Sequence, residues 1–217
     1  MIKIEKVDVF GWESAIRGMR NPMNSWDKSD SNWEIMNEDE YELGYDPDIE
    51  FVIGDNDLKL MKTLSKAGSD HGKFLRMINV TLDITAPLYW WKEFDTYKVG
   101  TTANSCSTMH KIHAKEFTID DFSCEHLLHP SMEVFKSVIE VLNITRDGFL
   151  KTKNKNWWWQ MIQLLPSSYN QKRTVQLNYQ VLKTMYFARR NHKLDEWGEF
   201  CKWCETLPYF KEICLNE

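Results

Sequence analysis

The stretch that decides the fold is residues 77–97, which read MINVTLDITAPLYWWKEFDTY. Over residues 77–84 apolar and more polar side chains alternate, and this pattern predicts a strand with one buried face. Thr85 and Pro87 follow in the order of an N-cap and a first-turn proline. We therefore expect a helix to begin there and to carry Trp90 and Trp91 away from the strand. The apolar positions of the strand are Ile78, Val80, Leu82 and Ile84.

The spacing of apolar residues, every second residue in strands and every third or fourth in helices, predicts further elements on either side of this stretch. Asn56 is the expected N-cap of a helix that ends near Gly68. Residues 100–108 are small, polar and rich in donors, so we expect them to approach an anion closely, with an ordinary loop as the alternative. We find no repeat or obvious linker, so the sequence predicts a single α+β domain over residues 1–217. Strands are expected at 2–10 and 173–177, and helices at 13–19, 57–67, 131–146, 156–165, 178–190 and 194–207.

The composition is that of a water-soluble globular chain with an excess of aromatic residues. Aromatic side chains make up 13% of the 217 residues and include 10 Trp, which excludes extensive disorder. The net charge of −5 argues against a nucleic-acid partner, and no apolar run is long enough to predict a membrane span. The sequence has five cysteines, and its start lacks the apolar core of a signal peptide. Both features favour a reducing compartment, so we expect the protein in the cytoplasm.

Residues 20–57 are expected to form an insertion that is rich in tryptophan and in acidic residues. Within it, residues 37–50 hold seven acidic side chains and no basic one. Such a run is typical of a solvated loop, and the alternatives are a lid or a metal-binding loop. The acid spacing of a calcium-binding loop is missing, so we expect no metal there.

Cysteine and histidine pairs offer single metal ligands but no complete metal site. The cysteine pair falls inside a predicted helix, where half-buried structural cysteines are the better interpretation. The histidine pairs lack a third ligand at a spacing typical of zinc sites. We therefore expect no metal. The pairs are Cys201 with Cys204, His110 with His113, and His126 with His129.

Two other clusters could contact a partner or a ligand. Residues 157–159 are three consecutive tryptophans that cannot all face one core, so we expect a subunit interface, with stacking on a flavin or a base as the alternative. Basic residues between 172 and 193 could hold a phosphate or form a solvated helix face. They are Lys172, Arg173, Arg189, Arg190 and Lys193.

Two segments together resemble the flavin-dependent thymidylate synthases. In that family a Leu-Pro and a Thr precede Asn-x-Arg-x-Leu and a later Leu-Arg, before an acidic and aromatic helix. The matching residues here are Leu165, Pro166, Thr174, Asn178, Gln180, Leu182 and Arg189. Upstream, the family signature is Arg-His-Arg, seven residues and a Ser, which corresponds here to residues 97–99, seven residues and Ser107. His71, the predicted strand and the tryptophan helix stand before this run in the family's order. The resemblance covers about 58–110 and 160–205.

The resemblance implies helices packed on a mostly antiparallel sheet and a homotetramer that binds FAD between its subunits. It also implies reductive methylation of dUMP, with methylene-tetrahydrofolate and NADPH as co-substrates and no protein nucleophile, so no catalytic side chain is expected. The implied cofactor-binding residues are His71, Lys98, Asn178 and Arg189. The implied substrate-binding residues are Asn104, Ser105, Ser107, Gln180 and Arg173.

The chain departs from the family at the arginines that contact phosphate or pyrimidine. The two signature arginines are Tyr97 and Val99 here, the signature His is Lys98, and the nucleotide-binding Arg of the C-terminal motif is Gln180. A charged hydrogen bond to phosphate is worth about 1.5–3 kcal/mol. Another basic residue, such as Arg190, would have to replace the binding free energy that is lost with these arginines. The resemblance implies an enzyme that methylates or otherwise modifies a dUMP-like pyrimidine nucleotide. A non-catalytic nucleotide-binding or assembly protein on the same fold is the alternative, and an unrelated interaction protein is a third.

Overall fold

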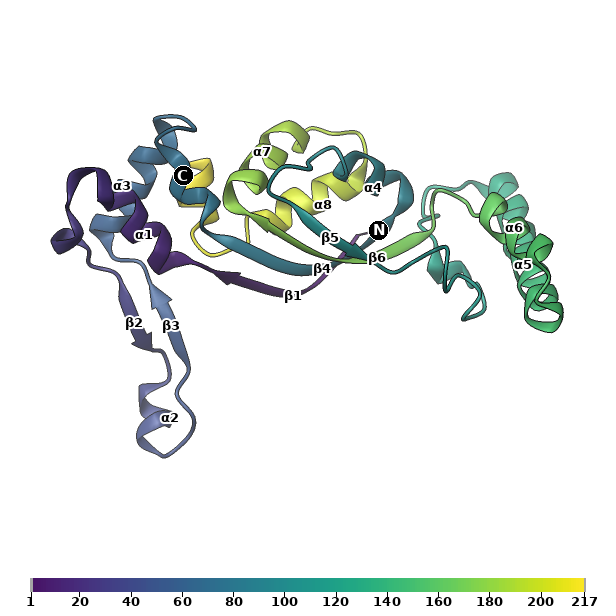
Figure 1. Cartoon of the computed structure of the whole chain (residues 1–217), viewed down its shortest axis with the longest axis horizontal. Coiled ribbons are helices and arrows are strands. Elements are labelled where there is room, and N and C mark those ends of the chain that lie inside the picture. Colours follow the sequence, from purple (N-terminus) through teal and green to yellow (C-terminus); the bar gives the residue numbers. More distant parts are fainter. Residues whose placement is uncertain (1, 217) are drawn as a thin grey trace. The chain divides into compact units, whose positions relative to one another are not determined.

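The computed structural model describes residues 2–216 and confirms an α+β fold with helices packed on a mostly antiparallel sheet (Figure 1). Strands β5 and β6 pair antiparallel, with Thr102 opposite Gln176 and Ser105 opposite Arg173. The strands expected at 2–10, 77–84 and 173–177 are all present. The sheet has the order β1-β4-β6-β5, formed by Lys3–Phe10, Asn79–Pro87, Asn170–Asn178 and Thr102–Ser105.

The described residues divide into two compact units, and strands β1, β4 and β6 each contribute residues to both. The single domain predicted from the sequence stays a prediction. The first unit contains residues 2–7, 81–176 and 190–200, and the second contains residues 8–80, 177–189 and 201–216.

The first unit has an aromatic core built by helix α4 (Leu88–Phe94) and the start of helix α8 (Asp195–Cys204). The rings of Trp90 and Trp197 lie 4.8 Å apart between centroids, and both side chains are fully buried. The centroid of Phe200 lies 5.7 Å from that of Trp90. Burial of such rings is the largest apolar contribution that single residues make to folding. The tryptophan-rich helix that follows the predicted strand therefore supplies much of this core.

A helical hairpin, α5 (His129–Thr152) and α6 (Lys155–Leu164), forms a second core in the same unit. Leu142 and Met161 are its fully buried residues. The three consecutive tryptophans lie on α6 and diverge as expected. Trp157 and Trp159 are 37% and 41% exposed, while Trp158 packs against the core and donates from Nε1 to the carbonyl of Met109 at 3.1 Å. Their assignment to a subunit interface stays a prediction.

The second unit packs helices α1 (Trp12–Arg20), α3 (Asp55–Lys66) and α7 (Tyr179–Arg189) with the C-terminal turn Lys211–Leu215. Trp12 packs edge-on against Tyr179 and Tyr209, at 5.4 and 5.7 Å between ring centroids. The 3-10 turns are Asn21–Met23, Trp26–Lys28 and Gly72–Arg76 in this unit and Ile119–Asp121 in the first.

The predicted insertion contains a two-stranded hairpin, β2 (Asn32–Ile35) and β3 (Ile49–Val52), with the short helix α2 (Glu38–Glu42) between the strands. The strands pair antiparallel, with Asn32 opposite Val52. Residues 41–50 are all exposed, which agrees with a solvated acidic segment. Helix α2 and the start of β3 occupy the two ends of the segment, and residues 43–48 between them have no regular structure.

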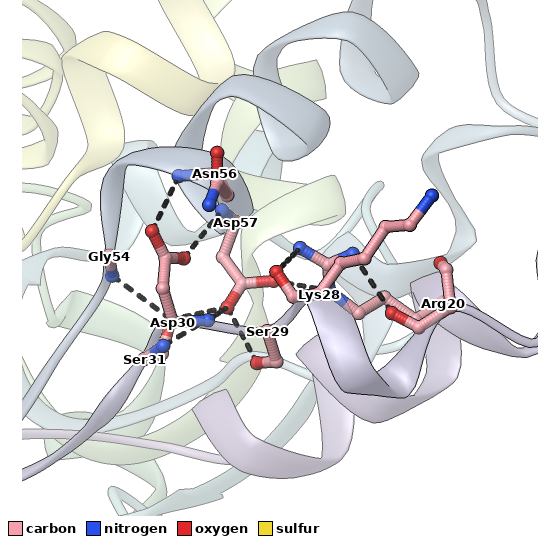
Figure 2. Close-up of polar contacts among 9 residues, drawn as sticks. Arg20, Lys28, Ser29, Asp30, Ser31, Gly54, Asn56 and Asp57 are labelled. Carbon is pink, nitrogen blue, oxygen red and sulfur yellow. Dashed lines mark hydrogen bonds and ion pairs between the residues drawn. The ribbon is translucent and has the colours of Figure 1, made fainter.

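A buried ion pair anchors the loop before this hairpin (Figure 2). Arg20 Nε donates to Asp57 Oδ1 at 2.6 Å, and both side chains are at most 5% exposed. Asp57 Oδ2 accepts bonds from the hydroxyls of Ser29 and Ser31, each at 2.7 Å. Burial alone would raise the pKa of Asp57, but the hydrogen bonds from Ser29, Ser31 and Arg20 outweigh it and lower this pKa below its ordinary value.

The same loop caps helix α3. The carboxylate of Asp30 accepts from the backbone N–H of Asn56 at 2.9 Å and of Asp57 at 3.1 Å. The prediction of Asn56 as the cap is therefore wrong: Gly54 is the N-cap, and because glycine has no side chain these amides need a distant acceptor. Local sequence does not reveal this arrangement, because the capping carboxylate stands 26 residues upstream of the amide that it caps.

Three other predictions about helices and strands are wrong. Strand β4 continues through Pro87, so Pro87 and not Thr85 is the N-cap of α4. Pro87 lacks an N–H and can end a ladder without losing a hydrogen bond. Helix α5 runs to Thr152 instead of 146, and Gly148 within it leaves room for the ring of Trp157. The expected loop at 101–108 contains strand β5, which is fully exposed and has no apolar alternation to reveal it.

The cysteine pair of α8 is structural, as predicted, and is more deeply buried than expected. Cys201 is 4% exposed and Cys204 is fully buried, and both are free thiols. Across residues 2–216 no helix has both the length and the apolar character needed to cross a membrane. Within the same range, no three His, Cys, Asp or Glu side chains gather as a metal-binding group.

Candidate functional site

A cleft of about 630 Å³ lies in the first unit, bordered by the segment that follows β5 and by the start of β6. This volume is in the range of pockets that hold small ligands. Four lysines and two aspartates line the cleft, together with small polar side chains and one tyrosine. The residues used below are Lys111, Lys115, Lys172, Asp121, Cys106, Ser107, Thr108, Tyr169 and Gln171.

One wall of the cleft is the segment 106–108, which the sequence singled out as small and rich in donors. Ser107 Oγ accepts from the backbone N–H of Met109 at 3.2 Å and of His110 at 3.0 Å. It also lies 2.9 Å from His110 Nδ1. The hydroxyl of Ser107 therefore closes a turn, and the wall presents little side-chain bulk to the cleft.

The beginning of β6 lies beside this segment and also lines the cleft. Gln171 is 7% exposed and donates from Nε2 to the carbonyl of Cys106 at 2.8 Å. The amide of Cys106 in turn donates to the carbonyl of Lys172 at 2.9 Å. These two bonds join the two segments into one surface of the cleft, so this surface is fixed before a ligand binds. Burial raises the pKa of Tyr169, which keeps its phenol protonated and available as a donor.

The lysines differ in whether a carboxylate neutralises them. Lys172 Nζ lies 2.9 Å from Asp83 Oδ2, and this hydrogen bond raises the pKa of Lys172. Lys115 pairs with Asp121. Lys111 has no carboxylate partner among the side chains that the structure describes, so its charge is uncompensated at the cleft. An exposed, uncompensated ammonium beside hydroxyl groups favours an anionic ligand such as a phosphate.

Arg173, which follows Lys172 on β6, binds side chains of its own unit. Its guanidinium lies 4.2 Å from the ring centroid of Trp91 and donates to Asp95 Oδ1 at 2.7 Å and to Gln171 Oε1 at 3.0 Å. Its side chain is 15% exposed. Arg173 therefore orients Gln171, which forms part of the cleft wall.

The other residues that the resemblance implies in the first unit lie outside the cleft lining. Asn104 and Ser105 are exposed on β5, opposite Thr174 and Arg173 of β6. Lys98 is exposed in the turn after α4. Of the implied residues, only Ser107 lines the cleft itself.

Four implied residues belong to the second unit. Asn178 Oδ1 accepts from the N–H of Val181 at 3.1 Å and so caps α7, while Gln180 lies in the first turn of that helix. Arg189 is the last residue of α7, and His71 precedes the turn Gly72–Arg76 and is exposed. No cleft described here gathers these residues, so their assignment to FAD stays a prediction.

Sequence reasoning missed the residues that give the cleft its charge and its rigidity. Lys111 and Lys115 lie in a stretch without helical or strand period, and only their four-residue spacing hints at a shared direction. Gln171 has no sequence signal, because its role depends on the carbonyl of Cys106, 65 residues away.

Solved structures of known proteins share this fold. Two crystal structures of the flavin-dependent thymidylate synthase ThyX from Helicobacter pylori, both with FAD and dUMP, match with TM-scores of 0.70 and 0.69 at 13% identity. These matches cover 99% and 100% of this chain and 98% of each of those chains. The UMP/dUMP methylase PolB from Streptomyces cacaoi, bound with 5-Br dUMP, matches with a TM-score of 0.62 at 14% identity, over 100% of this chain and 95% of that one. No protein-family model and no curated protein sequence matches the chain. The chain therefore has the fold of the flavin-dependent thymidylate synthases, as the sequence predicted.

Proposed function

We propose that the protein binds a pyrimidine nucleotide of the dUMP type in the cleft of the first unit and modifies it with the help of a flavin. The observation that carries this proposal is the uncompensated Lys111 beside the preformed wall 106–108 in a cleft of about 630 Å³. A nucleotide monophosphate needs such a cation and nearby donors for its phosphate. The neighbours in structure that hold dUMP and FAD support this choice of ligand.

Each residue of the cleft has a separate task in this proposal. Lys111 pairs with the phosphate, and the turn closed by Ser107 lets the nucleotide approach the backbone closely. The phenol of Tyr169 stays protonated and donates a hydrogen bond. Gln171 ties the segment after β5 to the start of β6 and so keeps the surface that would contact the nucleotide in place.

FAD is the proposed cofactor. His71, Asn178 and Arg189 would hold its polar groups, and Lys98 would partly replace the arginines that the family has at its signature. A bound reduced flavin supplies a hydride, so this chain needs no nucleophilic side chain for the reaction. We further propose methylene-tetrahydrofolate and NADPH as co-substrates, and a homotetramer as the active assembly.

A second candidate function is non-catalytic binding of a nucleotide on the same fold. The positions of the family's signature arginines favour it, because the ring of Tyr97 packs 6.3 Å from that of Trp197 and Val99 is 91% exposed. Neither side chain carries the positive charge with which an arginine pairs with a phosphate. In this case the cleft would serve regulation or assembly, and the protein would carry no flavin.

Calorimetric titration with dUMP tests the binding proposal. We expect saturable binding by the unaltered chain and affinity about 10- to 100-fold weaker in Lys111→Gln, because a charged hydrogen bond is worth about 1.5–3 kcal/mol. The matched control is Lys136→Gln, an exposed lysine of α5 that pairs with Glu133. Absence of binding, or equal loss in both variants, would contradict the proposal. Flavin absorbance after reconstitution with FAD, followed by rescue of a thymidine auxotroph, then separates the catalytic from the non-catalytic candidate.

A further inference from the structure

Asn170, the first residue of strand β6, lines the cleft of the first unit and has no task in the function proposed above. Its neighbours Tyr169 and Gln171 line the same cleft. The side chain of Asn170 is half-buried, so a hydrogen bond from it to a ligand would be partly shielded from water. A few uncharged polar groups in such a cleft orient a ligand and provide specificity.

The carboxamide of Asn170 is held by a neighbouring hydroxyl. Ser123 Oγ donates to Asn170 Oδ1 at 2.9 Å. Ser123 is held in turn, because its backbone N–H donates to the carbonyl of Ser168 at 2.9 Å. Among the described residues no group accepts a hydrogen bond from Asn170 Nδ2, and this nitrogen keeps access to solvent. The amino end of the carboxamide is therefore the polar end that can donate to a ligand.

The charge beside Asn170 favours a contact with the base of a nucleotide over a contact with its phosphate. Asp120, which also lines the cleft, stands three residues before Ser123. In the part of the chain that the structure describes, no cation pairs with its carboxylate. A carboxylate repels a phosphate and does not repel an uncharged ring. Lys111 offers the phosphate a cation, so Asn170 is suited to the base.

We propose that Asn170 distinguishes uracil from cytosine in the nucleotide that this cleft binds. Next to N3, uracil carries the carbonyl oxygen O4, which accepts a hydrogen bond, whereas cytosine carries the amino group N4, which donates one. The amino group of Asn170 pairs with O4 and meets N4 as donor against donor. A shielded polar group without a partner carries a full desolvation penalty, so one fixed donor discriminates between the two bases. The inference rests on the proposed function, because it concerns the ligand of the same cleft.

Calorimetric titration of the full chain with dUMP and with dCMP tests the inference. We expect dUMP to bind about tenfold more tightly than dCMP, or better. Asn170→Asp keeps an acceptor for Ser123 but presents an oxygen in place of the amino group, so the ratio of dUMP affinity to dCMP affinity should fall by about tenfold or more. The added negative charge weakens both nucleotides through their phosphate, and the ratio cancels this effect.

Two further variants separate a role in specificity from a structural role. Ser123→Ala removes the hydroxyl that holds Asn170, so the carboxamide can turn either end to the ligand and the affinity ratio should fall towards one. Ser123→Thr keeps the hydroxyl and should retain the ratio of the unaltered chain. Damage to the cleft alone would weaken both nucleotides equally and leave the ratio unchanged. Thermal melting checks that each variant folds.

The matched control is Asn156→Asp, which makes the same change at an exposed position of α6 outside the cleft lining and should leave the ratio unchanged. Binding of dUMP with an unchanged ratio in Asn170→Asp and in Ser123→Ala would overturn the inference and leave the proposed function standing. So would equal affinities of the unaltered chain for the two nucleotides, or an equal fall of the ratio in Asn156→Asp. Failure of both nucleotides to bind the unaltered chain would contradict the proposed function and the inference together.

Discussion

Replacement of Arg20 by methionine should expose the energetics of the buried ion pair. The variant leaves the carboxylate of Asp57 fully buried and without its cation. Breaking a buried pair in this way costs about 3–5 kcal/mol. We expect the lower end, about 3 kcal/mol, because the hydroxyls of Ser29 and Ser31 and two backbone amides still donate to Asp57.

The pH dependence of this loss has a definite sign. In the unaltered chain the lowered pKa of Asp57 contributes stability that is present above its ordinary value of about 3.9 and is lost as pH falls through the lower folded value. Without Arg20 the burial of the carboxylate is less opposed, which raises its pKa. The folded variant then favours the protonated acid, so its deficit should shrink between pH 7 and pH 4.5.

Urea unfolding followed by circular dichroism at both pH values measures this free energy. The double variant Arg20→Met with Asp57→Asn should recover about half of the loss, because no buried charge remains unpaired. Lys3→Met is the control, since Lys3 pairs with Glu5 at the surface and should cost less than about 1 kcal/mol. A deficit below about 1 kcal/mol in Arg20→Met, or one that grows as pH falls, would refute this reasoning.

Two further variants or treatments test other packed features. Gly148→Ala should destabilise the protein by about 1–3 kcal/mol, because the new Cβ would lie 2.6 Å from the ring of Trp157, whereas Gly198→Ala in α8, with open space around it, should raise the melting temperature. At pH 8 a thiol reagent should label exposed Cys106 quickly and spare the buried cysteines of the C-terminal region, whose pKa burial raises to about 11 for Cys201 and about 12 for Cys214. Mass spectrometry of the labelled peptides checks this order, and rapid labelling of Cys214 in the folded protein would contradict it.

The sequence predicted those elements whose cause lies within a few neighbouring residues. The alternation before Thr85 predicted the strand β4, and the amphipathic pattern predicted the helix that carries Leu142. It failed where a distant residue decides the structure. Asp30 caps α3 from far upstream, and the ring of Trp157 occupies the space that a side chain at Gly148 would need.

The candidate site also has a part that local sequence predicts and a part that it does not. The small, donor-rich segment that ends at Thr108 was visible as a pattern and does line a cleft. The charge of that cleft comes from Lys111, which no local pattern distinguishes from an ordinary surface lysine. In the second unit the sequence showed only an insertion dense in tryptophan. The contact of Trp33 with Glu13 of α1 joins residues 20 positions apart, so no local pattern reveals it.

The Asp30 cap has a consequence for how this chain tolerates change in length. The bonds from Asn56 and Gly54 to Asp30 and Ser31 close the chain at the base of the hairpin β2–β3. Everything between these bonds is, in thermodynamic terms, a loop whose ends are already joined. The entropy of such a loop varies only with the logarithm of its length, and a doubling costs about 0.6 kcal/mol. Segments could therefore be grafted into or trimmed from the tip near Gly44 with little effect on the stability of the helices that anchor it.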